Sequence, residues 1–304
     1  MSKTTINNTK GIAWALVSVL SAGSMTVGVR AASEALSSTT IVLYRFGIAT
    51  AILMTMIALL PKYRAKLSFK RKGAHILRGV LIAFATHFGF YAITAIPVNT
   101  AAVLFFTAPI FAVVLSVVVQ GETIGPRRIV AIAMGFVGAV IVCQPGVGAA
   151  ATETSLWGYA AALCASVLFA LALIMSRGLA EVDGVFSTVV SAGVITTLIS
   201  IPISWPTLQW STSAWIIGVV IFLSIAGLIR NVADIEQYHW GEAAIVGPFS
   251  YLRLIVVALG AYWLFRELPD MPTLIGGAII IASTFYIALR ERMMGGSARP
   301  PSGP

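Results

Sequence analysis

Hydrophobic residues occur along this chain in long runs that polar residues interrupt at regular intervals. A helix that crosses a bilayer needs about 20 consecutive apolar residues. Runs of that length predict ten helices, near residues 11–30, 39–60, 75–94, 98–120, 127–143, 156–176, 185–205, 212–234, 243–265 and 272–290. Short connections with Pro or Gly, such as AIPVN and GETIGP, separate several of them. The pattern predicts an all-α polytopic membrane protein.

Composition supports this class of protein. Of the 304 residues, 58% are hydrophobic and 10% are charged, with a mean hydropathy of +0.93. A soluble domain carries about 25% charged residues. The net charge of +9 does not indicate a nucleic-acid partner, because the basic residues lie between apolar runs rather than on one face. Cys143 and Cys164 both fall inside apolar runs, which favours a packing role over a disulfide or a metal site.

The basic residues also predict the orientation in the membrane. If the N-terminus is cytoplasmic, most of the 20 Lys and Arg residues fall in cytoplasmic segments. The loops QPGVGAAATETS and SWPTLQWSTS then lie outside, and neither contains a basic residue. Basic residues are enriched in cytoplasmic loops of membrane proteins. Both termini are therefore expected in the cytoplasm.

Residues of the first half recur in the second half. Gly11, Arg30 and Glu34 recur as Gly158, Arg177 and Glu181 at a shift of 147 positions, and Glu122 recurs as Glu267 at a shift of 145. Ordered pairs at a nearly constant offset indicate an internal repeat. Each half contains five spans, so the second copy must cross the membrane in the inverted direction. Inverted repeats are typical of alternating-access transporters, which bind their substrate where the halves meet.

This organisation predicts the segments of the chain. A cytoplasmic N-terminus at 1–10 precedes a five-helix repeat at 11–143, and an external linker at 144–155 leads to a second five-helix repeat at 156–290. The tail at 291–304 is expected to be disordered and cytoplasmic. The two repeats are expected to surround a central cavity. The first span then belongs to the fold and is not a cleaved signal peptide.

Several stretches resemble the drug/metabolite transporter superfamily, EamA type, over residues 10–291. They are YRFGIA in the second predicted span, HILRGVLIAFATHFGFYAITAIPVNTAAVLFFTAPIFAVVLSVVVQGE, RRIVAIAMGFVGAVIV and PFSYLRLIVVALGAYWLFRELPDMPTLIGGAIIIAS. Within that family the chain is most similar to the branch of S-adenosylmethionine uptake carriers and related bacterial permeases. The resemblance implies a ten-helix carrier of small polar metabolites in the bacterial inner membrane. Arg253 departs from the repeat, since the first copy has Ala108 there.

Arg253 lies near the middle of the ninth predicted span and has no acidic neighbour in the sequence. A charge at the centre of a spanning helix costs roughly 2.5–3.5 kcal/mol on insertion scales. Two explanations fit. Arg253 either binds carbonyl groups of a neighbouring helix, or it faces the cavity and recognises a carboxylate, phosphate or sulfonate group of the substrate. We favour the second.

Other embedded polar residues are further candidates for the site. Arg230 and Asp234 stand four positions apart in the eighth span and can form an ion pair on one helix face. Arg45, near the outer end of the second span, either contacts substrate or has a structural use, by snorkelling outward or by pairing with Glu34. His87, in the third span, is either a hydrogen-bonded core residue or a group that exchanges a driving proton.

Aromatic residues near these charges can stack on a substrate or simply pack between helices. They are Tyr44, Phe84, Phe88, Tyr91 and Tyr251. With the charged candidates, they make up the expected substrate site.

The charge balance of the site predicts the class of substrate. Arg45, Arg230 and Arg253 outnumber Asp234, which favours a zwitterionic or anionic metabolite such as an amino acid or an organic acid. S-adenosylmethionine or a drug-like cation is the alternative. S-adenosylmethionine is suggested by the family branch alone, and its positive sulfonium fits this charge balance less well. Proton coupling, and a homodimer through the fifth or tenth span, are further hypotheses.

Other classes of function find less support in the sequence. No GxxxxGK[ST] motif is present, so the chain has no ATPase of its own, and no HExxH motif indicates a metalloprotease. An intramembrane enzyme is therefore disfavoured, and conductance would separate a channel from a carrier. We expect a secondary-active carrier that has lipid and a small molecule as its partners, and that has no cofactor, metal ion or catalytic residue.

Overall fold

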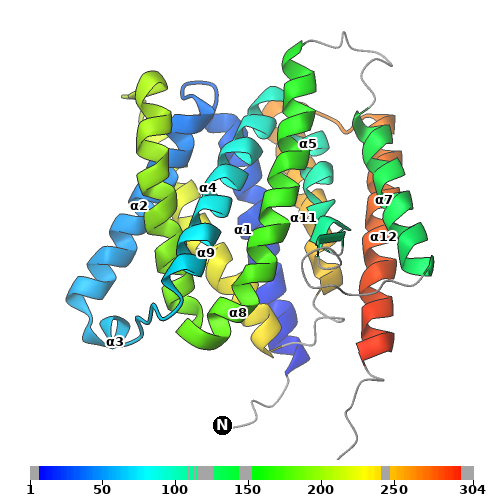
Figure 1. Ribbon diagram of the computed structural model, residues 1–304. Helices are drawn as coiled ribbons and strands as arrows, with labels where there is room; N and C mark the ends of the chain where they lie inside the picture. The colour runs from blue at the N-terminus through cyan, green and yellow to red at the C-terminus, as the bar shows by residue number, and fades with distance from the viewer. Residues whose placement is uncertain are drawn as a thin grey trace, which may run out of the picture.

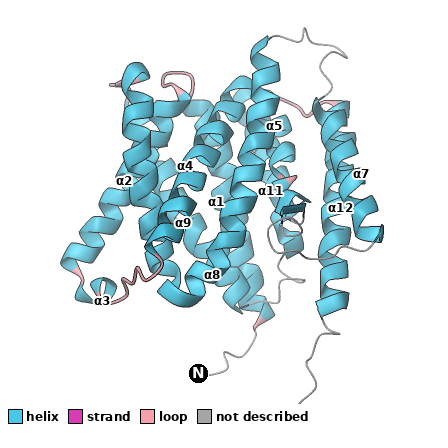
Figure 2. Ribbon diagram, in the orientation of Figure 1, coloured by secondary structure: helices cyan, strands magenta, loops and turns pink. Residues whose placement is uncertain are grey.

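The computed structural model describes residues 7–108, 110–112, 114–115, 126–143, 153–240 and 247–295. All regular structure within these residues is helical (Figure 2). The helices are α1 (Asn8–Ala32), α2 (Ser38–Leu59), α3 (Pro61–Arg64), α4 (Lys72–Ala95), α5 (Val98–Phe105), α7 (Pro126–Cys143), α8 (Glu153–Ser204), η1 (Trp205–Thr207), α9 (Ala214–Trp240), η2 (Gly247–Tyr251), α11 (Leu252–Phe265) and α12 (Met271–Gly295). The long helices stand side by side, with α2 at one edge and α7 and α12 at the other (Figure 1).

In the described part of the chain, six helices are long and apolar enough to cross a membrane. They are Thr9–Ala32, Ser38–Leu59, Lys72–Ala95, Leu156–Ser176, Val182–Thr207 and Ala214–Asp234. Shorter apolar helices occupy the other four predicted spans, at Val98–Ala112, Ile129–Val142, Phe249–Phe265 and Met271–Tyr286. The multi-pass, all-helical class is thereby confirmed. The count of ten membrane-spanning helices stays a prediction.

α8 contains two of the predicted spans, and Gly184 divides them. The backbone leaves helical geometry at this residue, with φ 78° and ψ 159°. Side chains make a positive φ of this kind unfavourable, so the break requires glycine. The two arms of α8 meet at the end of the bundle where α1 begins (Figure 1).

Helices of one half of the chain pack mainly against helices of the other half. α1 packs against α9 and α11, α4 against α8, α5 against α11, and α7 against α12. Apolar side chains from both halves form one core, in which Ile41, Leu104, Leu223 and Ile280 are fully buried. The two halves therefore form one packed body rather than two separate domains.

Asp183 links the two halves at the end of the bundle where α1 begins (Figure 1). Its carboxylate accepts hydrogen bonds from Ser68 Oγ at 2.7 Å and from the backbone N–H groups of Lys70 at 2.7 Å and Arg71 at 3.1 Å. Nε2 of His75 lies 3.2 Å from the same carboxylate. The Asp183 side chain has no exposed surface. The loop before α4 is thus held against the break in α8.

Arg30 and Glu267 link the halves at the opposite end. Nη2 of Arg30 lies 3.2 Å from Oε1 of Glu267, and Nη1 donates to the carbonyl of Thr94 at 2.8 Å. The second carboxylate oxygen of Glu267 accepts the backbone N–H of Val98 at 3.1 Å. These contacts join α1, the α4–α5 turn and the α11–α12 connection. Glu122, the repeat counterpart of Glu267, lies outside the described residues.

The predicted boundary segments are only partly described. Residues 1–6 of the N-terminus and 144–152 of the linker lie outside the described residues. α12 continues to Gly295, so the predicted tail begins with helix, and residues 296–304 lie outside the described part.

Gly276 sets the close approach of α12 to α7. A Cβ atom at Gly276 would lie 2.5 Å from the carbonyl oxygen of Gly138 and 2.5 Å from Cγ2 of Val142. We expect Gly276→Ala to push the helices apart and lower the midpoint of thermal unfolding in detergent. The control is Gly47→Ala, because a Cβ there meets nothing within 4 Å and alanine favours helix by about 1 kcal/mol. Equal midpoints for the two variants would contradict this packing.

Replacing the buried carboxylate of Asp183 tests the link at the α8 break. We expect Asp183→Asn to leave buried N–H donors unpaired, each at a cost of about 1–3 kcal/mol, and so to release the loop before α4. Trypsin should then cleave after Lys70 and Arg71 faster than in the wild-type protein. Glu34→Gln, at an exposed carboxylate, is the control. Cleavage rates that match the control would show that this contact does not hold the loop.

Candidate functional site

Asp234 and Arg230 form the ion pair that the sequence predicts. They lie one turn apart on α9, with Arg230 Nε 3.4 Å from Asp234 Oδ2. The other carboxylate oxygen, Oδ1, accepts a hydrogen bond from Ser18 Oγ on α1. Ser18 is buried, whereas the Arg230 and Asp234 side chains are 21% and 37% exposed. Asp234 thus connects the first helix of the chain to the second half, and it retains an accessible surface.

Arg253 lies beside this ion pair, where the charges of both Arg230 and Asp234 act on it. Its guanidinium lies over the ring of Phe106 on the other half of the chain, 4.6 Å from the ring centroid. Phe106 packs in turn against Tyr251 at a centroid distance of 5.3 Å. Among the described residues, none forms a hydrogen bond or an ion pair with the Arg253 guanidinium. No described contact therefore supports the structural explanation, in which Arg253 binds carbonyl groups of a neighbouring helix.

Arg45 points into the bundle and not outward to the surface. It is 7% exposed, and its guanidinium lies 4.5 Å and 5.5 Å from the ring centroids of Phe46 and Phe90. It also lies against Gly227 of α9, where an added Cβ would be 2.6 Å from Nη2. Glu34 is exposed, and no ion pair joins it to Arg45 in the described part of the chain. The snorkelling and Glu34-pairing alternatives for Arg45 are therefore wrong for this structure.

These four ionisable residues, Arg45, Arg230, Asp234 and Arg253, form what we call the charged cluster. The charge of Arg230 acts on Arg45 as well as on Arg253. The four residues come from α2, α9 and α11. Aromatic rings line the cluster, and the ring centroid of Phe169 lies 6.0 Å from the Arg230 guanidinium. The cluster contains three arginines and one carboxylate, so it carries an excess of positive charge among apolar helices.

His87 and Tyr44 make their contacts elsewhere. Nε2 of His87 lies 3.0 Å from Ser200 Oγ on α8, and its buried Nδ1 has no hydrogen-bond partner among the residues that the structure describes. The Tyr44 hydroxyl donates to the carbonyl of Gln209 at 2.8 Å, and its ring packs edge-on against Trp210. Tyr44 thus anchors α2 to the loop after η1, and neither side chain has a described hydrogen bond or ring contact with the charged cluster.

The aromatic candidates of α4 are exposed along one stripe of the helix. Phe84, Phe88 and Tyr91 are 41%, 41% and 37% exposed. Within the described residues, no ring contact joins them to the arginines of the cluster. Their role in a substrate site stays a prediction.

Several contributors to this site carry no signal in the sequence. Ser18 and Gly227 are ordinary residues of apolar helices, and Phe46, Phe90 and Phe106 are ordinary aromatic packing residues. Their importance depends on which helices meet. Of these residues, only Phe106 could have been found from the repeat. It lies two positions before Ala108, which is the repeat counterpart of Arg253.

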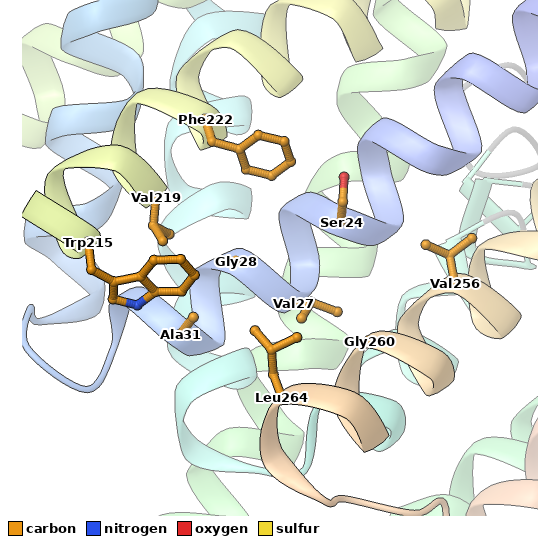
Figure 3. A pocket seen from close by; sticks show the side chains of 10 residues that line it. All are labelled: Ser24, Val27, Gly28, Ala31, Trp215, Val219, Phe222, Val256, Gly260 and Leu264. Carbon is orange, nitrogen blue, oxygen red and sulfur yellow. The ribbon is translucent and has the colours of Figure 1, made fainter.

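An apolar pocket of about 260 Å³ lies between α1, α9 and α11 (Figure 3). Figure 3 shows Trp215, Phe222 and Leu264 around it, with Ser24 as its polar side chain. It contains no residue of the charged cluster. The pocket and the cluster are therefore separate features, although the same three helices are close to both.

Comparison with known proteins gives a consistent result. Residues 9–144 match the EamA-like transporter family. The S-adenosylmethionine uptake transporter of Rickettsia felis is 28% identical over 283 residues, which cover 93% of each chain. The pseudopaline exporter of Pseudomonas aeruginosa is 27% identical over 93% of this chain and 97% of its own. The riboflavin transporter of Vibrio cholerae is 26% identical over 93% of this chain and 91% of its own.

A solved structure described only as a crystal structure of a protein shares the fold. Its TM-score is 0.63 at 18% identity, over 94% of this chain and 99% of the other. The resemblance to the EamA-type permeases, and to their S-adenosylmethionine branch, is confirmed by the sequence matches. The family and these relatives are transporters and not enzymes.

Proposed function

We propose that this chain, an EamA-type permease of the drug/metabolite transporter superfamily, is a secondary-active carrier that moves a small polar metabolite by alternating access. The observation that carries the proposal is the charged cluster, in which Arg253 has no counter-ion of its own among the described residues. A charge within a spanning helix is costly, and ionisable residues in such positions mark substrate or ion pathways.

S-adenosylmethionine is the first substrate to test, in place of a simple amino acid or an organic acid. Uptake transporters of S-adenosylmethionine are similar to this chain over 93% of its length. S-adenosylmethionine has the ammonium and carboxylate groups of an amino acid as well as a sulfonium. Its carboxylate suits the excess of arginine in the charged cluster, and its ammonium suits Asp234.

The sulfonium has a place in this arrangement as well. Phe106 lies against the Arg253 guanidinium and packs against Tyr251, and the charge of Asp234 acts on Arg253. Aromatic faces attract cations such as quaternary ammonium groups, and a sulfonium is similar in charge. The sulfonium of S-adenosylmethionine is therefore compatible with the charged cluster, although three arginines and one aspartate alone would disfavour a positive substrate.

The predicted architecture belongs to the same proposal. It consists of ten spans in two inverted five-helix repeats around a central substrate site, with both termini in the cytoplasm and the protein in a bacterial inner membrane. The packing of α5 against α11 and of α7 against α12 supports it, since these pairs are repeat counterparts. The first turn of α1 and the last turn of α12 also lie at the same end of the bundle (Figure 1).

Alternating access requires contacts that open and close at the two ends of the bundle. The Arg30–Glu267 contact at one end and the Asp183 contact at the other both bridge the two halves. Such contacts are suited to form in one state and break in the other. Proton coupling through His87 or Asp234 belongs to this proposal, and accumulation driven by a pH gradient would test it.

Loss of the arginine tests the proposed role of the charged cluster. We expect Arg253→Ala to insert and fold normally, and to lower uptake of S-adenosylmethionine into proteoliposomes to the level of empty liposomes. Arg253→Lys, which keeps the charge but loses the forked donor geometry, should retain a small fraction of the uptake. Radiolabelled substrate and equal protein loading provide the measurement.

Arg64→Ala is the matched control, because Arg64 is exposed on the short helix α3. It should leave uptake unchanged. Normal uptake by a folded Arg253→Ala variant would contradict the proposed site. Ion conductance far above the turnover of a carrier would identify a channel instead.

A further inference from the structure

Arg45 is a buried cation for which the described residues supply no anion. It is 7% exposed, and its buried Nε atom has no hydrogen-bond partner in the described part of the chain. The carboxylate of Asp234 is bound by Ser18 and Arg230, and no ion pair joins it to Arg45 among the described residues. The charge of Arg230 acts on Arg45 with the same sign. A buried, unpaired guanidinium is unfavourable unless an anion reaches it.

We propose that Arg45 binds the carboxylate of the transported solute, and so selects solutes that have an amino-acid end. This inference rests on the proposed function and specifies which side chain recognises which group. Arg253 is stacked over Phe106 and lies beside Tyr251, so it forms the wall that contacts the remainder of the solute.

Gly227 holds the Arg45 guanidinium in place. A Cβ atom at Gly227 would lie 2.6 Å from Nη2, 2.9 Å from Nε and 3.1 Å from Cζ. The guanidinium therefore lies directly against the backbone of α9, in a space that exists only because residue 227 has no side chain. The rings of Phe46 and Phe90 lie within 5.5 Å of Cζ and complete the slot. The slot fixes the plane of the guanidinium, and a carboxylate can then accept two parallel hydrogen bonds from one edge.

The position of Arg45 also explains how both charged ends of an amino acid can be bound. Arg45 comes from α2 in the first half, whereas Asp234 comes from α9 in the second half. A carboxylate at Arg45 would neutralise that residue, and an ammonium would share the Asp234 carboxylate with Arg230 and Ser18. The solute then bridges the two halves, as a carrier that couples binding to movement requires.

Gly227→Ala tests the inference without altering any charge. The atoms that the new methyl group meets belong to the end of a flexible side chain, so the guanidinium should move and the fold should persist. Gly218→Ala is the control on the same helix, since a Cβ there meets nothing within 4 Å. Arg45→Ala and Arg253→Ala complete the set of variants.

The readout is the ratio of two inhibition constants against uptake of radiolabelled S-adenosylmethionine. One inhibitor is unlabelled S-adenosylmethionine, and the other is its decarboxylated analogue. In the wild-type protein and in Gly218→Ala, we expect the analogue to be weaker by about tenfold to hundredfold, as loss of a hydrogen-bonded charged group implies. In Gly227→Ala the ratio should fall close to one. Residual uptake by Arg45→Ala, where measurable, should show the same low ratio.

The outcomes separate the inference from the function on which it rests. If Gly227→Ala keeps the wild-type ratio, Arg45 does not recognise the carboxylate, although S-adenosylmethionine transport stands. If the ratio falls in Arg253→Ala instead, Arg253 and not Arg45 binds the carboxylate of the solute. If the wild-type protein takes up no S-adenosylmethionine, the proposed substrate is wrong and the assignment of Arg45 is overturned with it.

Discussion

The cost of charge in a low-dielectric environment governs this structure. Water cannot solvate a guanidinium or a carboxylate inside hydrocarbon, so each must meet protein groups or a wet cavity. Asp234 meets two such groups, Ser18 and Arg230, and thereby joins α1 to α9. Arg45 and Arg253 meet aromatic rings but no carboxylate among the described residues. The cluster is therefore satisfied only in part by the protein, and a solute of suitable charge would complete it.

Glycine determines how closely two pairs of neighbouring elements approach each other. At Gly276 the backbones of α12 and α7 nearly touch, and at Gly227 the space is occupied by the side chain of Arg45. The two cases have different consequences. A methyl group at Gly276 meets backbone that cannot move aside, whereas one at Gly227 meets a side chain that can. The first glycine therefore stabilises the fold, and the second positions a charged group.

Hydropathy predicts the helical segments well, because the membrane imposes a simple length and composition on each span. The Arg230–Asp234 pair follows from spacing on a single helix, and the structure confirms it. The separate spans predicted at 156–176 and 185–205 already require a break between them, and the structure places it at Gly184. The contacts of the buried Asp183 carboxylate were not predicted, since they depend on a loop more than a hundred residues away. The inward direction of Arg45 and the outer anchoring of Tyr44 likewise depend on which helices meet. The sequence of a single span does not show which other helices will pack against it.

A structure of the protein with S-adenosylmethionine bound would test the central claim most directly. The charged cluster is predicted to hold the solute, with its amino-acid end between Arg45 and Asp234 and its sulfonium near Phe106. Density at that position, connected to these side chains, is the expected result. Density confined to the apolar pocket between α1, α9 and α11, with the cluster unchanged, would contradict the claim.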